Sequence, residues 1–272
     1  MDFKQRSAEL GWVIRDSSFS ATHFTILTLG DAQCRLFPLD KVISFQSGGA
    51  SRSDDLEHLL NDIVLPKLHA YAGRLVLHGG AFLWSGFVVG LIAQSGHGKS
   101  TLSASLQAAG CSLLGDDALI LRHNPNGVVA ERIYPSLRLL PDSLENIFPT
   151  IKLAAPVANF TDNRRVPFDV GIESAPLRAL FRLTDPGKDI RVVQLAPAAA
   201  CMAIIQNAFA FDSEDADEAR NRFAQAALAA QVIPVFDLTY PRDYARLPEV
   251  HTAIFATLDM LPDTPRSETT RM

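Results

Sequence analysis

The sequence is poor in cysteine, has no strongly basic segment and contains no long apolar run. Its cysteines, Cys34, Cys111 and Cys201, lie far apart without C-x-x-C spacing. This argues against a disulfide framework or a cysteine metal site and indicates a reducing compartment. The 30 Asp and Glu residues outnumber the 25 Lys and Arg residues, and the formal net charge is −5. The basic surface typical of nucleic-acid binding is therefore missing, and we expect no nucleic-acid partner.

The sequence also lacks segments that would direct it to a membrane. The first residues show no signal-peptide pattern, and no apolar run reaches the roughly 18 residues that span a bilayer. The longest run, residues 88–93, has the length of a buried strand. We therefore expect a cytoplasmic protein with no membrane partner.

The chain of 272 residues is long enough to bury a sizeable core. The pattern predicts a small β-rich subdomain over residues 1–50, a main α/β domain over 51–262 and a flexible polar tail over 263–272. The glycine-containing stretch 47–53 is the best candidate linker. No internal repeat is present.

Alternating short strands and helices predict a mixed sheet flanked by helices. A helix over 53–71 is expected to kink or locally restart at Pro66. Gly79-Gly80 is interpreted as a turn, Ser85-Gly86 as a hairpin turn, and residues 150–164 as an irregular loop. Further helices are predicted over 100–109, 142–147, from Pro197, over 214–230 and over 248–261. Strands are predicted over 11–14, 22–29, 34–37, 74–78, 87–92, 111–114, 118–122, 128–134, 166–170, 177–183, 190–195 and 232–238. The helix over 214–230 is expected to bury one face, formed by Ala216, Ala219, Phe223, Ala226, Ala227 and Ala230.

The segment 90–101 organises the chain. An apolar strand ends in a glycine-bearing loop, and Gly98-Lys99-Ser100 opens a helix, as in a phosphate-binding P-loop (Walker A). Backbone N–H groups and the helix N-terminus would hold phosphate oxygens, Lys99 would reach the β- and γ-phosphates, and Ser100 would bind Mg²⁺. The alternative is a glycine-rich strand–helix turn with an incidental lysine. The predicted nucleotide-binding residues are Gln94, Ser95, Gly96, His97, Gly98, Lys99, Ser100 and Thr101.

Two further features accompany this loop. Asp116-Asp117 follows a predicted strand downstream of the P-loop helix, where a carboxylate would hold Mg²⁺ or accept a proton. Neighbouring side chains point in different directions, so the pair would divide these roles; the alternative is an exposed acidic turn. His78 ends an upstream strand and could stabilise a transferring phosphoryl group, or it could be a core or turn histidine.

These motifs together resemble the HPr kinase/phosphorylase family. That family places a histidine upstream of a G-x-S-G-x-G-K-S loop and an Asp-Asp pair after it, and residues 77–81, 93–100 and 110–117 follow this order. The strong match covers about residues 74–122. Weaker similarity continues over residues 134–139, 176–180 and 235–243. The chain looks like the shorter, diverged members, some of which phosphorylate ribosomally made peptides such as lasso peptides.

The resemblance implies a P-loop kinase domain with the fold shared by HPr kinase and phosphoenolpyruvate carboxykinase, and with roles for specific residues. Asp117 would be the base that accepts the serine proton, Asp116 its metal-side partner, and His78 an aid to phosphoryl transfer. Positional guesses give Glu131 as a second Mg²⁺ contact and Arg165, of the Arg164-Arg165 pair, as the arginine that neutralises phosphate. The alternative for that pair is a solvated basic turn. Two departures stand out: Ala93 replaces the first glycine of the loop, and the N-terminal part is too short for the family's regulatory domain.

The resulting prediction is an ATP- and Mg²⁺-dependent serine kinase acting on a peptide or small protein. The alternatives are a nucleotide-binding regulatory module without turnover, HPr kinase proper, a small-molecule kinase and an enzyme of the phosphoenolpyruvate carboxykinase type. By analogy with the family, a homo-oligomer is possible.

Overall fold

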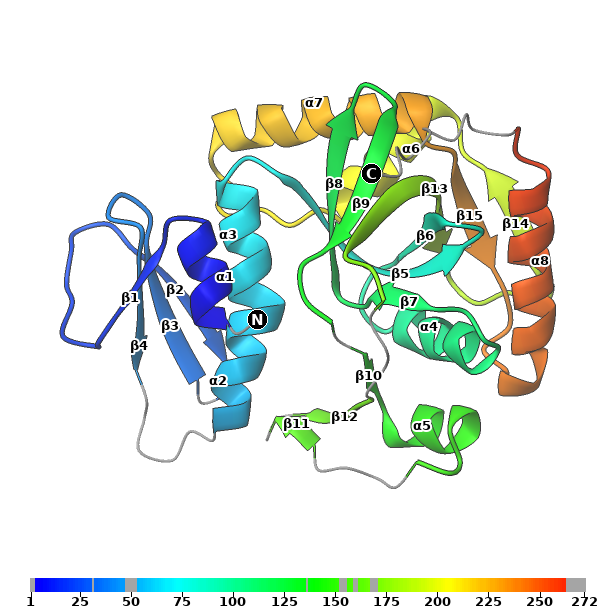
Figure 1. Cartoon of the computed structure of the whole chain (residues 1–272), viewed down its shortest axis with the longest axis horizontal. Helices are drawn as coiled ribbons and strands as arrows, with labels where there is room; N and C mark the ends of the chain where they lie inside the picture. The colour runs from blue at the N-terminus through cyan, green and yellow to red at the C-terminus, as the bar shows by residue number, and fades with distance from the viewer. Residues whose placement is uncertain are drawn as a thin grey trace, which may run out of the picture.

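The structure is a computed structural model that describes residues 3–30, 32–46, 53–135, 137–151, 156–158, 161–166 and 171–262. The predicted linker, apart from Ser53, lies outside these residues. So do the predicted tail and most of the predicted strand over 166–170. Figure 1 shows a small sheet on one side, a long helix beside it, and a larger sheet flanked by helices. Among the described residues, no helix combines the length and apolar character of a membrane span.

The small sheet contains β1 (Val13–Arg15), β4 (Val42–Gln46), β3 (Ala32–Phe37) and β2 (Thr25–Leu29), in that order. It follows α1 (Phe3–Glu9), a helix that the sequence analysis missed, as it missed β4. Alternation along β3 buries Cys34 and Leu36, which pack with Trp12 against the long helix. This sheet therefore has its own core, shared with one face of that helix.

The long helix is continuous but changes its winding in the middle. It runs through α2 (Ser53–Leu59), the π-helical turn η1 (Leu60–Val64) and α3 (Leu65–Tyr71). The Leu65 N–H bonds the carbonyl of Leu60, one residue further back than in an α-helix. Pro66 has no N–H and would crowd the carbonyl four residues earlier. The prediction was that the helix kinks or locally restarts at Pro66, and α3 does restart there, with the proline in its first turn after the wide turn.

The larger sheet has the order β14-β15-β13-β6-β5-β8-β9, and β7 pairs with β5. Because β9 also pairs with the first residues of β13, strands β13, β6, β5, β8 and β9 form a closed ring. The bounds are β5 (Leu75–Trp84), β6 (Phe87–Ile92), β7 (Leu113–Gly115), β8 (Ala118–Asn124), β9 (Gly127–Arg132), β13 (Ser174–Leu183), β14 (Arg191–Gln194) and β15 (Val235–Thr239).

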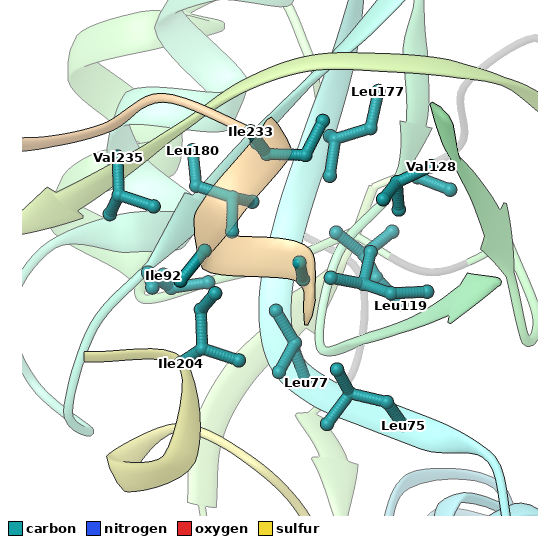
Figure 2. Close-up of a cluster of buried hydrophobic side chains, with 14 of the residues drawn as sticks. Leu75, Leu77, Ile92, Leu119, Val128, Leu177, Leu180, Ile204, Ile233 and Val235 are labelled. Atoms are coloured by element: carbon teal, nitrogen blue, oxygen red, sulfur yellow. The ribbon is translucent and has the colours of Figure 1, made fainter. Parts of the chain in front are cut away.

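Two apolar clusters lie on opposite faces of this sheet. One includes Leu77, Leu119, Leu177 and Leu180 from the ring strands (Figure 2), closed by α6 (Pro197–Gln206) and α7 (Ala216–Val232). The other packs α4 (Lys99–Ala108), α5 (Pro141–Ile147) and α8 (Leu247–Asp259) on the outer face. Burial of these apolar side chains holds α4 firmly against the sheet, and α4 carries the lysine of the predicted P-loop.

Several sequence predictions need correction. Gly79-Gly80 is not a turn, because β5 runs through both residues. A Cβ on Gly79 would lie 2.9 Å from the backbone oxygen of Leu91, so glycine is needed there for a close approach of strands. By contrast, the hairpin turn at Ser85-Gly86 is confirmed, with positive φ at both residues.

Two other errors concern segments with weak patterns. The described part of 150–164 contains strands β11 (Pro156–Ala158) and β12 (Thr161–Arg165), and β12 pairs with β10 (Arg138–Leu139). In α7, Ala226, Ala229 and Ala230 are buried as a helical face requires. The predicted face was wrong at its N-terminal end, however, since Ala216 and Phe223 are exposed.

Candidate functional site

The predicted phosphate loop joins the end of β6 to the start of α4. Gly96 and Gly98 have φ of 82° and 81°, values that glycine adopts without strain. Gly98 is the N-cap residue and α4 begins at Lys99, with no side chain capping the helix. The first N–H groups of α4 are thus left for an external acceptor. Ala93 is buried in the outer apolar cluster and has no positive φ, which explains why alanine is tolerated where the motif has glycine.

This loop borders a cavity of about 350 Å³. His78, Asp117 and Arg138 line the same cavity as the loop, so the structure brings together four segments that are separate in the sequence. The remaining lining residues are Gln94, Ser95, Gly96, Gly98, Lys99, Ser100, Thr101, Leu139, Leu140, Ser143 and Asn163. His97, a predicted nucleotide contact, does not line the cavity; its Nε2 lies 3.2 Å from Oδ1 of Asp185.

Lys99 and Asp116 form the buried floor of the loop. The Lys99 Nζ lies 4.0 Å from Oδ1 of Asp116, and both side chains are almost fully buried. Apart from a contact with the Ser100 hydroxyl, neither Asp116 oxygen has a hydrogen-bond partner among the described residues. Burial raises the pKa of Asp116, and the Lys99 charge opposes the shift. A carboxylate in this position has lone pairs to offer to an additional cation or donor.

The close approach of Asp116 to β5 depends on Gly80. A Cβ at residue 80 would lie 2.7 Å from Oδ1 of Asp116 and 2.7 Å from Oγ of Ser103. Real side chains do not approach this closely, so any other residue would displace the carboxylate. The second glycine of the Gly79-Gly80 pair is therefore part of the site, although the sequence analysis assigned it to a turn.

Asp117 has a left-handed backbone, with φ of 76°, which is uncommon outside glycine and asparagine or aspartate. Its carbonyl accepts the Gly79 N–H at 3.1 Å. Its carboxylate accepts two hydrogen bonds from Arg138, at 2.7 Å (Oδ1) and 3.2 Å (Oδ2). Burial alone would raise the pKa of Asp117, but the Arg138 and Lys99 charges outweigh it and lower the pKa to about 2.

Arg138 is a site residue that the sequence analysis did not identify. From β10 it contacts Asp117 and, 3.0 Å away, the Asp62 carboxylate on the π-helical turn. Asp62 also pairs with His58. The pKa of Arg138 is raised by the two carboxylates despite its burial. The segment 134–139, which contains Arg138, was noted only for weak family similarity. A single arginine between two leucines forms no motif that would mark it as a site residue.

His78 lies on β5 opposite Ala118, the residue after Asp117. Its ring makes an edge contact with Phe209, with centres 5.9 Å apart. Burial, assisted by the Lys99 charge, lowers the pKa of His78 to about 4, although Asp117 opposes the shift. The imidazole is therefore neutral at pH 7, able to donate one hydrogen bond and accept another.

Ser100 lines the phosphate cavity, whereas Asp116 lies buried behind it and Glu131 does not join them. Mg²⁺ in phosphotransfer sites keeps several waters and takes only one or two protein ligands besides the phosphates. Ser100, with the Asp116 carboxylate that contacts its hydroxyl, is therefore the pair whose chemistry suits the ion. Glu131 instead pairs with Arg122 at 2.7 Å and lines a different cavity. Within the described ranges no cluster of three or more His, Cys, Asp and Glu residues could hold a metal alone.

Arg165 lies next to the site but does not line its cavity. Its β12 position pairs with Arg138 on β10, while its guanidinium lies 3.5 Å from Glu57 and 6.0 Å from the Tyr134 ring centre. Of the arginines in this region, Arg138 is thus the one that contacts the predicted base.

Comparison with known proteins gives little further information. No family model and no curated protein matches the chain. Among solved structures, the chain is similar to the HPr(Ser) kinase/phosphatase from Coxiella burnetii, with 14% identity and a TM-score of 0.36 over 68% of this chain and 97% of that chain. The description of the fold therefore rests on the mixed sheet and flanking helices given above.

Proposed function

We propose that this protein is a kinase that transfers the γ-phosphate of ATP to a serine hydroxyl of a peptide or small protein, with Mg²⁺ as cofactor. The main support is that one cavity is lined by the glycine loop, Lys99, His78 and Asp117. A simple phosphate-binding loop would not need an aspartate and a neutral histidine facing it. The sequence resemblance to HPr kinase and its short relatives suggests the serine acceptor.

In this proposal each residue has a separate task. The loop N–H groups and Lys99 bind the phosphates and balance their charge. The serine oxygen attacks the γ-phosphorus, its proton passes to Asp117, and the bond from that phosphorus to the β–γ bridging oxygen breaks to release ADP. Neutral His78, whose ring hydrogen-bonds the Asp117 backbone, lies beside the transferring group and helps to position it with the base. Bound at Ser100 and Asp116, Mg²⁺ would neutralise charge on the phosphate oxygens.

Asp117 can accept a proton while Arg138 remains bound, because a carboxylate offers about four lone-pair positions and Arg138 occupies two. Arg138 lies where it can also contact an incoming phosphoryl oxygen, since it lines the cavity. An arginine facing both groups holds the base in place and balances charge that develops on the phosphoryl group.

One observation supports a second candidate, a nucleotide-binding regulatory module without turnover. Asp117 with a pKa of about 2 is a weak base, because the best proton acceptors have pKa values near the working pH. If the pKa of Asp117 stays this low when an acceptor binds, the site would hold nucleotide without transferring phosphate. The two candidates differ only in whether phosphate leaves the nucleotide.

A phosphate-transfer assay tests the proposal. The purified protein is incubated with Mg²⁺, γ-labelled ATP and a peptide library with a fixed central serine, with HPr and free serine as separate acceptors. Label on peptide, absent with a central alanine and with Lys99→Ala, supports a peptide kinase; label only on HPr or free serine assigns the alternative acceptors. ATP that binds but gives no labelled acceptor and no free phosphate contradicts the kinase and supports the module.

A further inference from the structure

A second cavity lies next to the phosphate loop and takes no part in the roles described so far. Its volume is about 230 Å³, and it is lined by Gly98 and Thr101 of the loop and first turn of α4. The other lining residues are Asp142, Tyr240, Arg242, Asp243, Tyr244 and Leu247. Gly98 and Thr101 also line the phosphate cavity. A ligand with phosphates on the loop can therefore extend over these two residues into the second cavity.

The order of strands places the two cavities on opposite sides of β6, the strand that leads into the loop. His78 on β5 and Asp117 before β8 lie on one side, since β5 is one neighbour of β6. β13 is the other neighbour and β15 follows it; Tyr240 and Arg242 come directly after β15. The proposed base, Asp117, and His78 are on the β5 side. The part of a donor that is not transferred can therefore extend towards the β15 side.

The walls of the second cavity suit a flat aromatic ring. The guanidinium carbon of Arg242 lies 4.5 Å from the centre of the Tyr240 ring, and Tyr240 is buried while Arg242 is exposed. Arg242 is anchored by a bond from Nη2 to the carbonyl of Thr184 at 3.0 Å. Arg242 also hydrogen-bonds the Tyr240 side chain, so this ring and the Thr184 carbonyl together hold the guanidinium in place. Its exposed side can then contact a planar ligand, and Leu247 adds an apolar surface.

The polar groups of this cavity favour a neutral ligand over a phosphate. The lining contains two carboxylates, Asp142 and Asp243, and one arginine. Asp142 accepts a hydrogen bond from the Tyr244 hydroxyl at 2.9 Å, and Asp243 accepts one from the Ala245 N–H. Each carboxylate keeps lone pairs that can accept from hydroxyl or amino groups, whereas a phosphate would be repelled.

A hydrogen-bonded chain joins the two cavities. The Thr101 hydroxyl lies 3.0 Å from the Ser143 hydroxyl, which lies 2.9 Å from the Tyr244 hydroxyl. Thr101 and Ser143 line the phosphate cavity, and Tyr244 lines the second one. These hydrogen bonds fix α5 and η2 (Tyr244–Arg246) relative to the first turn of α4. The second cavity therefore has a fixed position relative to the loop.

We infer that this second cavity binds the base and ribose of the nucleoside triphosphate, with the base stacked on Arg242 above Tyr240 and ribose or amino groups accepted by Asp142 and Asp243. The inference rests on the proposed function, since it needs a nucleotide whose phosphates occupy the loop. It adds a cavity that would select a nucleotide over a bare polyphosphate as the phosphoryl donor.

The test compares Mg²⁺-ADP with inorganic tripolyphosphate, which has the phosphates without the nucleoside, by calorimetric titration. Arg242→Ala is expected to raise the Kd for ADP about tenfold and to change that for tripolyphosphate less than about twofold. Arg242→Lys keeps the charge but not the flat group, so it should lose most of the same affinity. Arg246→Ala is the matched control, because Arg246 pairs with Glu249 outside the cavity and should change neither Kd.

The outcomes separate the inference from the proposed function. A wild-type protein that binds neither ligand overturns both. Equal loss of ADP and tripolyphosphate in Arg242→Ala overturns only the inference, because Arg242 then serves phosphate. The inference also fails if Arg242→Ala leaves ADP binding unchanged, or if it raises only the KM of a serine peptide, which would place the acceptor in this cavity. Selective loss of ADP binding supports it.

Discussion

The two sides of β6 present arginines in opposite settings. On the β5 side, Arg138 is 13% exposed and contacts two buried carboxylates, Asp117 and Asp62. On the β15 side, Arg242 is exposed, lies over the Tyr240 ring and hydrogen-bonds neutral groups, the Thr184 carbonyl and the Tyr240 side chain. The first arginine faces the phosphate cavity but is held by two carboxylates, whereas the second has no carboxylate partner in the described contacts of its cavity.

This difference suggests a division of labour around one loop: groups on the β5 side would carry out phosphoryl transfer, and groups on the β15 side would bind the rest of the nucleotide. Buried, paired charges are costly to rearrange, so they hold reacting groups in fixed positions. An exposed guanidinium can stack on a ligand without exposing an unpaired charge. We therefore expect substitutions on the β5 side to affect folding and transfer, and those on the β15 side to affect ligand choice.

Replacing Lys99 removes the group that both sides share. Lys99→Ala is expected to lower phosphoryl transfer at least about 10³-fold, because the phosphate charge and the Asp116 carboxylate both lose their nearest cation. Steady-state transfer and ADP titration measure the loss. Lys188→Ala, at an exposed position after β13, serves as the control and should behave as wild type; transfer retained in Lys99→Ala would refute the loop's role.

Arg138→Ala tests whether the β5 side is a structural cluster. The change leaves Asp117 and Asp62 buried without their cation, and breaking a buried ion pair costs about 3–5 kcal/mol. We expect a loss of about 3 kcal/mol in the free energy of unfolding, measured by urea denaturation at pH 7. Arg242→Ala should change it by less than about 0.5 kcal/mol. Equal effects for the two arginines would end the distinction drawn here.

Asp117→Asn separates chemistry from binding within the β5 side. Asparagine has nearly the same shape and tolerates the left-handed backbone found at this position, so nucleotide binding should stay within about threefold of wild type. Transfer should fall about 10²-fold, since the proton acceptor is lost. Single-turnover transfer and ADP titration give the two values. Asp185→Asn, near His97 on the other side, is the control; full transfer by Asp117→Asn would exclude Asp117 as the base.

The sequence pointed to residues that the structure places together. The glycine loop and Asp116-Asp117 were predicted from local chemistry and His78 through the family resemblance, and Lys99, Asp117 and His78 line one cavity. Local signals work here because a P-loop is made almost entirely of consecutive residues. The same reasoning failed for Gly79-Gly80, where glycine serves a close approach of strands and side chains rather than a turn. Composition alone does not distinguish these two uses of glycine.

Residues whose role depends on distant partners could not be found from spacing. Arg138 gains its importance from Asp62, which lies 76 positions earlier on a different element. Glu131 was assigned to the metal by its position in the chain, but along β9 Val128 and Ala130 are buried while Glu131 is not. Alternation along the strand therefore points it away from them and towards Arg122. An aromatic cavity built from a loop after β15 likewise carries no motif.

The pH dependence of folding provides the smallest expected effect and again concerns the β5 side. His78, facing Lys99, Asp117 and Arg138, has a folded-state pKa of about 4 against about 6.5 when unfolded. Below pH 6.5 the unfolded chain therefore binds more protons, and stability falls as the pH is lowered towards 4. Between pH 7 and pH 5 this histidine should account for about 2 kcal/mol of lost stability.

Urea denaturation of His78→Gln should show a correspondingly shallower loss over that interval, while between pH 7 and pH 8 the difference from wild type should stay constant. Parallel losses for the two proteins from pH 7 to pH 5 would mean that burial does not lower the pKa of His78, and the neutral state assigned to it in the proposed transfer step would lose its support.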